Sequence, residues 1–239
     1  MKKYAKEFRI STEEYKSPGW YKERAGIPSA SGLGFLFDTL KDGFTPSAKA
    51  KKYLKQLAFE RKFGVTFENF VTKAMADGTF FEDFAKMVYV RETHNVLSEA
   101  YSSVSSWFVA TPDGIVFDVK LRKYGGLECK IVGDVTFMEL MEEGIPITHE
   151  LQTQSQMMAR GWDWVDYIVV NLKTRAYFIL RINRNNVLIK RIYERLHQPL
   201  NLPELKDVGV KQFDDNLLRE FMGENHLQDE DLIIKDLPF

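Results

Sequence analysis

Two charged segments, each next to a strand-like run, constrain the possible fold and chemistry of this 239-residue chain more than any other feature of its sequence. Asp113 lies in the sequence Thr-Pro-Asp-Gly, whose proline and glycine favour a turn. Glu128 and Lys130 lie in Leu-Glu-Cys-Lys-Ile, which alternates apolar and polar residues as a half-buried strand does. Side chains alternate between the two faces of a strand, so Glu128 and Lys130 share one face and Cys129 takes the other. The sequence therefore predicts adjacent strands on which two carboxylates and an ammonium group come together.

The carboxylates of Asp113 and Glu128 predict a divalent cation. Two carboxylates within hydrogen-bonding reach repel each other unless a positive charge lies between them. Oxygen ligands of this kind suit Mg²⁺ or Mn²⁺. A lysine beside such an ion completes the groups that activate a water molecule against a phosphodiester. A surface hairpin with ordinary charges is the alternative for so common a triplet, and the rest of the chain decides between the two.

One helix is expected on each side of these strands. Residues 148–161 are typical of a helix that begins at an N-cap, Thr148, and ends at a glycine. Gln152, on its first turns, then faces either the cleft or solvent. Residues 63–71 predict a second helix with an apolar stripe, and Glu68 lies beside that stripe. Its position fits either a boundary residue that reaches water or a third carboxylate of the site.

In this combination the motifs resemble those of the lambda exonuclease, or YqaJ, type of viral recombinase nuclease, a group within the PD-(D/E)xK superfamily. The resemblance covers residues 20 to 182 and keeps the motifs in the family's order. Its motifs are Trp…Arg-x-Gly-x-x-Ser-Ala-Ser at residues 20–31, Gly-x-x-x-Glu at 64–68, Thr-Pro-Asp-Gly, Glu-x-Lys, and Gln-x-Gln-x-x-Met followed by Gly161. Two departures are modest: Ser29 stands where threonine is common, and Cys129 stands where the family takes varied apolar residues.

The resemblance implies a metal-binding role for four residues. Asp113 and Glu128 would bind a metal ion directly, with the backbone carbonyl of Cys129 as a further ligand. Glu68 would hold a second metal ion or its waters. The implied cofactor is Mg²⁺, with Mn²⁺ as the substitute and two ions per site.

The resemblance also implies how the reacting groups are oriented. Lys130 would orient or deprotonate the attacking water, and Gln152 would position Lys130 or that water. A lysine serves as a base only if its pKa falls well below the free value near 10.4. Arg24, Ser31 and Thr111 match family residues that hold the 5′-terminal phosphate, which suits a guanidinium and two hydroxyls.

The order of predicted elements indicates an α/β fold, a restriction-endonuclease-like core with a central mixed β-sheet flanked by helices. The expected elements are helices to about residue 77, strands from about 87 to 132, one or two helices to 160, strands at 165–170 and 176–181, and a helix at 185–197. The pair Gly125-Gly126 is expected to mark the hairpin turn before the Glu-x-Lys strand. We expect an exonuclease domain over residues 1–202, with a helical N-terminal part at 1–80. Residues 203–239 would add a C-terminal helix, around 213–223, and an acidic tail.

Composition narrows the class of protein. With 44% hydrophobic and 28% charged residues, the chain suits one domain with a sizeable core. The single cysteine, Cys129, excludes a disulfide framework and a four-cysteine iron–sulfur cluster. The four histidines show no ligand spacing, which argues against zinc. Neither a membrane span nor the apolar core of a signal peptide is present in the sequence, so a cytoplasmic enzyme is expected, in a bacterial host cell if a phage encodes it.

Charge is distributed unevenly along the chain. The formal net charge is −1, but residues 1–62 hold fourteen bases and seven acids, whereas residues 203–239 hold four bases and ten acids. A basic N-terminal region suits a surface that faces DNA, and an acidic end suits solvent or a partner. The ending Pro238-Phe239 resembles the acidic Pro-Phe tip by which bacterial single-stranded-DNA-binding proteins dock replication enzymes. A packed or frayed terminus is the alternative.

These expectations together predict a Mg²⁺-dependent 5′→3′ exonuclease. It would degrade one strand of linear double-stranded DNA from its ends and leave 3′ single-stranded overhangs for single-strand-annealing recombination. The resemblance further implies a homo-oligomeric ring, with a trimer favoured, and a single-strand annealing protein as partner. The alternatives are a PD-(D/E)xK endonuclease or single-strand exonuclease, and, outside enzymes, a DNA-binding recombination scaffold whose nuclease site has decayed.

Overall fold

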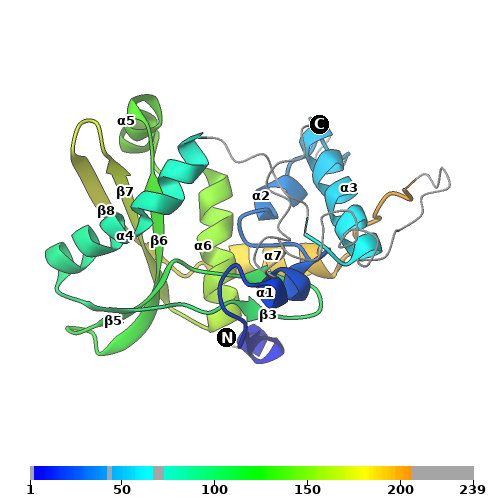
Figure 1. Cartoon of the computed structure of the whole chain (residues 1–239), viewed down its shortest axis with the longest axis horizontal. Coiled ribbons are helices and arrows are strands. Elements are labelled where there is room, and N and C mark those ends of the chain that lie inside the picture. The colour runs from blue at the N-terminus through cyan, green and yellow to red at the C-terminus, as the bar shows by residue number, and fades with distance from the viewer. Residues whose placement is uncertain (1–2, 42–44, 67–72, 206–239) are drawn as a thin grey trace, which may run out of the picture. The chain divides into compact units, whose positions relative to one another are not determined.

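The structure of the chain, a computed structural model, describes residues 3–41, 45–66 and 73–205 (Figure 1). The chain divides into two compact units, Met1–Glu204 and Leu205–Phe239, and the fold below is that of the first unit. Glu68, the helix expected at 213–223 and the acidic tail lie outside the described residues. Within the described ranges, no helix combines the length and the apolar character that crossing a bilayer requires.

A mixed five-stranded sheet forms one half of this unit, in the order β2-β5-β6-β7-β8. Its strands are β2 (Val96–Ser98), β5 (Gly114–Asp118), β6 (Lys123–Ile131), β7 (Trp164–Asn171) and β8 (Ala176–Asn183). Only the pair β6–β7 is parallel, and the other neighbours are antiparallel. Every residue of β7 is buried, as expected for a central strand with both faces covered. The predicted α/β fold with a central mixed sheet is confirmed.

Two groups of helices cover the two faces of this sheet. Helix α4 (Lys73–Thr93) packs on the face that carries Leu127 and Cys129. Helices α5 (Asp134–Glu143) and α6 (Ile147–Arg160) form the connection from β6 to β7, and α5 packs on Tyr167 and Val169 of the other face. Because side chains alternate along β6, the face opposite Cys129 turns Glu128 toward α6.

The second half of the unit is built on a small three-stranded sheet, in the order β1-β3-β4. The remaining elements are η1 (Lys3–Glu7), β1 (Arg9–Ile10), α1 (Pro18–Arg24), α2 (Leu33–Leu36), α3 (Ala48–Phe63), β3 (Ser103–Val104), β4 (Val109–Ala110) and α7 (Asn186–His197). Helix α6 runs between the two halves and shares a core with α2, α3 and α7 (Figure 1). Leu57, Phe108, Met157 and Ile189 are fully or almost fully buried in that core.

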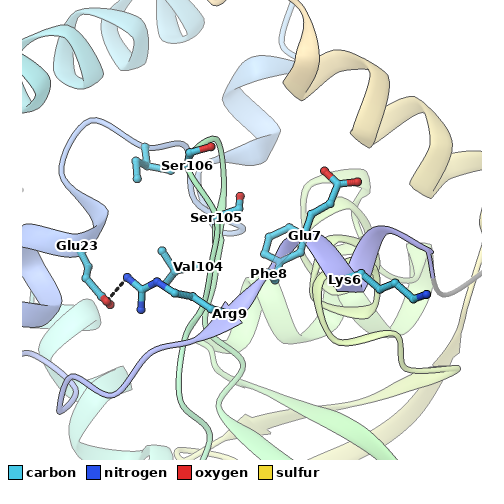
Figure 2. Close-up of a pocket in the computed structure, with 9 residues that line it drawn as sticks. Lys6, Glu7, Phe8, Arg9, Glu23, Val104, Ser105 and Ser106 are labelled. Atoms are coloured by element: carbon cyan, nitrogen blue, oxygen red, sulfur yellow. Dashed lines mark hydrogen bonds and ion pairs between the residues drawn. The ribbon is translucent and has the colours of Figure 1, made fainter.

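Helix α1 is fixed to the small sheet by an ion pair. Figure 2 shows Arg9 of β1 reaching Glu23 of α1 at one side of a surface cavity of about 560 Å³. The Ser11 hydroxyl donates a second hydrogen bond to Glu23, at 2.6 Å. The segment after α1 then pairs with β4, since Ala30 N donates to Val109 O at 2.9 Å and Val109 N donates to Pro28 O at 3.0 Å.

Several predicted boundaries are wrong. The strands expected from residue 87 begin only at Val96, because α4 continues to Thr93. The helix expected at 63–71 does not begin at Phe63, because Phe63 is the last residue of α3 and Gly64 is the left-handed C-cap of that helix at φ 69°. Residues 67–71 lie outside the described residues. Thr148 is not an N-cap, because α6 begins at Ile147 with Pro146 as the cap residue.

The glycine pair 125–126 lies inside β6 and not in a turn. A Cβ atom at Gly125 would come within 2.5 Å of the Trp164 ring, and one at Gly126 within 2.5 Å of the Trp162 ring. These glycines therefore allow two indole rings to approach the backbone of β6. The predicted end of α6 is confirmed, because Gly161 is its left-handed C-cap at φ 70°.

Candidate functional site

Glu128 is the centre of the first candidate site. Its side chain is only 2% exposed, and its carboxylate accepts three hydrogen bonds from side chains. Lys130 Nζ and Gln152 Nε2 each donate to Oε1 at 2.6 Å, and Gln156 Nε2 donates to Oε2 at 2.7 Å. Lys130 Nζ also donates to Gln152 Oε1 at 3.2 Å. Together with Asp113 we call these residues the acid cluster.

Strand register places Asp113 beside Glu128. Gly114 is the register partner of Leu127 in the antiparallel pair β5–β6, so the residue before Gly114 lies next to the residue after Leu127. Asp113 Oδ2 accepts a hydrogen bond from Cys129 N at 2.7 Å, which holds its carboxylate against β6. Burial, followed by the charges of Glu128 and Glu82, raises the pKa of Asp113 well above its ordinary value. The site thus concentrates negative charge where water is largely excluded.

The donor set of the acid cluster fits a divalent cation. Asp113 and Glu128 offer carboxylate oxygens, the donors that Mg²⁺ prefers, and the pKa of Asp113 is raised by burial and then by carboxylate repulsion, both of which a bound cation would offset. Among the described residues, no three histidine, cysteine, aspartate or glutamate side chains are grouped as metal ligands. Both oxygens of Glu128 accept hydrogen bonds from Lys130, Gln152 and Gln156, which a cation bound to Glu128 would have to share or displace.

Lys130 carries its proton in this arrangement. Burial by itself would lower the pKa of Lys130, but the charge and the hydrogen bond of Glu128 outweigh it, and the net pKa is raised. The condition for a role as base, a lowered pKa of Lys130, is therefore not met in the ion pair with Glu128. The Cys129 thiol takes no part in this network: it packs in the core beneath α4, where burial raises its pKa.

Sequence reasoning missed two residues of this site. Glu82 of α4 pairs with Lys86 at 2.6 Å, and its charge contributes to the raised pKa of Asp113. A signal was present, since Gly-x-x-x-Glu occurs at residues 78–82 as well as at 64–68. Gln156 follows Gln152 by one helical turn and so lies on the same face of α6. The alternative of a solvent-facing Gln152 is wrong, because Gln152 is 9% exposed and bonded to Glu128.

Arg24, Ser31 and Thr111, the residues that match the family's phosphate site, are the second set of candidates, and we call them the Arg24 cluster. The guanidinium of Arg24 lies 4.0 Å from the centre of the Trp20 ring, and it makes no hydrogen bond or ion pair with any described residue. Burial lowers the pKa of Arg24, and this effect outweighs the opposite effect of nearby groups that include the Glu60 carboxylate. Such a cation favours an anionic ligand.

The other two residues of the Arg24 cluster, Ser31 and Thr111, carry hydroxyl groups. Ser31 is exposed, and its Oγ lies 3.3 Å from Ser29 Oγ. Thr111 follows β4, the strand that pairs with the segment before Ser31. Gln156 of the acid cluster donates a long hydrogen bond, 3.5 Å, to the carbonyl oxygen of Thr111. The two clusters are therefore joined through the short segment from Thr111 to Asp113.

A buried acid pair with a lysine on the central strands of a mixed sheet defines the core of a PD-(D/E)xK nuclease. Comparison with protein families agrees: the family described as the YqaJ-like viral recombinase domain matches residues 19–163. The chain belongs to this family. The prediction of a YqaJ-type nuclease, and hence of an enzyme, is confirmed at the level of the family.

Solved structures give the same result. An alkaline exonuclease, LHK-Exo, from Laribacter hongkongensis is 27% identical with a TM-score of 0.64, over 75% of this chain and 89% of that one. Its complex with dAMP gives 26% identity and a TM-score of 0.65 over the same shares. A phage-related exonuclease from Haemophilus somnus 129PT shares the fold, with 17% identity and a TM-score of 0.53 over 71% of this chain and 90% of that one. A search of curated proteins finds no match.

Proposed function

We propose that this protein is a metal-dependent exonuclease that degrades the 5′-ended strand of linear double-stranded DNA and leaves 3′ single-stranded overhangs. The observation that carries the proposal is the acid cluster, in which Lys130 and Gln152 meet on the carboxylate of Glu128 beside Asp113. The solved relatives from two bacteria are described as exonucleases, which supports the same activity for this chain.

In this proposal Asp113 and Glu128 hold Mg²⁺, with the backbone carbonyl of Cys129 as a further ligand. Glu82 takes the role that the family resemblance gives to Glu68. A divalent cation at this position neutralises the developing charge on the phosphate and favours ionisation of a water molecule. Mn²⁺ has the same preference for oxygen ligands and should substitute.

Lys130 and Gln152 act on the attacking water and not on the affinity for DNA. Both side chains are hydrogen-bond donors that the Glu128 carboxylate holds at 2.6 Å. With Glu128 engaged by a cation, these donors would be available to hold the water and the scissile phosphate. The raised pKa of Lys130 supports a role as an orienting cation in the resting state. A role as base would need its pKa to fall when Glu128 is engaged elsewhere.

Recognition of an end, and not of an internal site, follows from the Arg24 cluster in this proposal. A terminal 5′-phosphate is close to doubly charged at neutral pH, and it matches a guanidinium that forms no ion pair with a described residue, together with two hydroxyls. A single-strand exonuclease and an endonuclease remain the enzymatic alternatives. A recombination scaffold with a decayed site is the non-enzymatic one.

The family resemblance extends the proposal to assembly and location. A homo-oligomeric ring, with a trimer favoured, would enclose the duplex, and a single-strand annealing protein would receive the overhang. The acidic Pro-Phe tail would be a docking peptide, and the protein would act in the cytoplasm of a bacterial host. Analytical ultracentrifugation at several protein concentrations tests the assembly, since a trimer should sediment at three times the mass of 27.8 kDa.

The experiment that tests the activity is digestion of end-labelled linear duplex compared with closed circular duplex, each with and without Mg²⁺. The proposal expects release of nucleotides from the 5′-ended strand of linear DNA, only with Mg²⁺, and no cutting of circles. Rapid cutting of circles would favour an endonuclease, digestion of single strands alone would favour the single-strand enzyme, and binding without cleavage would favour the scaffold.

A further inference from the structure

Ser102 is hydrogen-bonded to Thr111, one of the three residues of the Arg24 cluster. Its side chain is 2% exposed, and its Oγ lies 2.9 Å from Trp20 Nε1 and 2.7 Å from Thr111 Oγ1. We propose that Ser102 is a positioning residue that turns the Thr111 hydroxyl into a hydrogen-bond donor for the terminal 5′-phosphate. The inference rests on the proposed binding of that phosphate by Arg24, Ser31 and Thr111.

The direction of the hydrogen bond follows from the donors and acceptors around Ser102. The indole N–H of Trp20 is a donor only, so Ser102 Oγ must accept from it. The Ser102 hydroxyl is buried, and a buried hydroxyl proton needs an acceptor. Within the described part of the chain, the acceptor that it contacts is Thr111 Oγ1. Trp20 therefore donates to Ser102, and Ser102 donates to Thr111.

This direction decides what Thr111 can offer a ligand. A threonine hydroxyl has one proton, and here Ser102 supplies the proton in the bond between the two oxygens. The proton of Thr111 itself is thus left for another acceptor. A phosphate oxygen only accepts hydrogen bonds, so a hydroxyl turned the other way would present lone pairs to it and repel it.

We call the two hydrogen bonds from Trp20 to Ser102 and from Ser102 to Thr111 the relay. Trp20 also contacts the Arg24 guanidinium. The face of its ring carries the Arg24 guanidinium at 4.0 Å, and its N–H edge points to Ser102. Helix α1, which carries Trp20 and Arg24, is tied to the small sheet by the ion pair of Arg9 and Glu23 (Figure 2). One buried indole thereby fixes both the guanidinium and, through Ser102, the hydroxyl of Thr111.

The test is the rate ratio between two linear duplexes that differ only in a 5′-phosphate or a 5′-hydroxyl end. Using one enzyme preparation for both substrates cancels any loss of folded protein. Ser102→Ala should lower the ratio by roughly threefold to tenfold, the range for one hydrogen bond. Ser103→Ala is the matched control: Ser103 is the next residue and the first of β3, it is fully buried, and its Oγ has no hydrogen-bond partner among the described residues. It should leave the ratio at the wild-type value.

A double-mutant cycle separates the relay from general packing. Thr111→Val removes the hydroxyl at nearly constant volume, and in this background Ser102→Ala should lower the ratio no further, because Ser102 acts through Thr111. A further loss in the double variant, or an equal loss in Ser103→Ala, overturns the relay. An unchanged ratio in Ser102→Ala, with a wild type that prefers phosphate, overturns the relay alone. A wild type that degrades both ends equally overturns the phosphate site and the relay with it.

Discussion

The acid cluster and the Arg24 cluster differ in whether neighbouring side chains bond to the central charged group. In the acid cluster, the carboxylate of Glu128 is compensated by Lys130 and by two glutamine amides of the same chain. In the Arg24 cluster, the guanidinium packs on an indole ring and forms no ion pair with a described residue, although the charge of Glu60 acts on it. In the proposed function, the first site would therefore have to exchange hydrogen bonds of Glu128 for a metal ion, whereas the second could bind an anion without breaking an ion pair. Substitutions should therefore disturb a network in one site and remove a ligand contact in the other.

The largest effect is expected in the acid cluster. Asp113→Asn and Glu128→Gln keep the shape of each side chain but remove its charge, and each should lower kcat by at least about a hundredfold, since a metal ion stabilises the transition state by several kcal/mol. Initial rates on linear duplex at saturating Mg²⁺ measure this.

The melting temperature provides the control for these two variants. Because the pKa of Asp113 is raised in the folded protein, its ionised form destabilises the fold near neutral pH, so Asp113→Asn should melt at or above the wild-type temperature without Mg²⁺. Added Mg²⁺ should raise the melting temperature of the variant less than that of the wild type. Near-normal rates in both variants would remove the metal site from these residues.

Arg24 should show the second-largest effect, and it should appear in specificity. Arg24→Gln should reduce the preference for 5′-phosphate over 5′-hydroxyl ends by roughly tenfold to a hundredfold, as expected for a hydrogen bond to a charged group. The melting temperature should stay equal or rise, because the variant no longer buries an unpaired cation. A large fall in stability would show that Arg24 belongs to a structural network like that of Glu128.

Substitution of Gln156 should have an intermediate effect, and it tests how much one hydrogen bond to Glu128 contributes to the acid cluster. Gln156→Met fills a similar volume but removes one hydrogen bond from the buried Glu128, which should cost about 1–3 kcal/mol of stability and roughly tenfold in kcat. Gln154→Met is the matched control. Gln154 is on the same helix and equally buried, but its amide bonds the backbone of Asn183 and Asn185.

Both glutamine variants should lose stability, and only Gln156→Met should lose activity per folded molecule. Urea denaturation and active-site-normalised rates measure the two quantities separately. Equal losses of kcat in the two variants would mean that any disturbance of helix α6 lowers kcat. The hydrogen bond from Gln156 to Glu128 would then have no specific role in catalysis.

The smallest effect concerns pH and His149. Burial, and then the charge of Lys130, lowers the pKa of His149 from 6.5 to about 4, and its Nδ1 lies 2.7 Å from the Tyr167 hydroxyl. The unfolded chain then binds more protons than the folded one below pH 6.5, so stability falls as the pH falls from 6.5 toward 4. Between pH 7 and 5.5 this group should remove about 1 kcal/mol.

His149→Asn keeps an acceptor for Tyr167 but does not titrate in this range. Its urea midpoint should therefore change less between pH 7 and 5.5 than that of the wild type. Parallel pH profiles for the two proteins would show that His149 is not a neutral buried group.

The sequence was a good guide where function and local pattern coincide. Alternation along residues 127–131 placed Glu128 and Lys130 on one face, and the structure has that arrangement because a strand fixes it residue by residue. The same is true of Gln152, which the periodicity of α6 turns toward the sheet. The sequence was a poor guide to Gly125, where a local preference for turns predicted a hairpin and the packing of Trp164 required a strand.

The two Gly-x-x-x-Glu segments show the same limit. Glu68 and Glu82 have equal claims in the sequence, and nothing local distinguishes them. In the structure α4 packs over the face of β6 that carries Cys129, and it is the charge of Glu82 that reaches Asp113. Spacing along the chain can therefore predict a third acid, and packing brings the charge of Glu82 to Asp113, whereas Glu68 lies outside the described residues.

By itself, the sequence determined the α/β class, the pair of strands with Asp113, Glu128 and Lys130, and the residues that match the family's phosphate site, because turns, strand alternation and motif spacing are local properties. Only the tertiary structure revealed the hydrogen bonds of Gln156, the effect of the Glu82 charge on Asp113, and the hydrogen bonds that link Trp20, Ser102 and Thr111. Trp20 and Ser102 are 82 residues apart in the chain, and only a shared core brings them within 2.9 Å. Direction and satisfaction of hydrogen bonds depend on such long-range contacts, which no local pattern encodes.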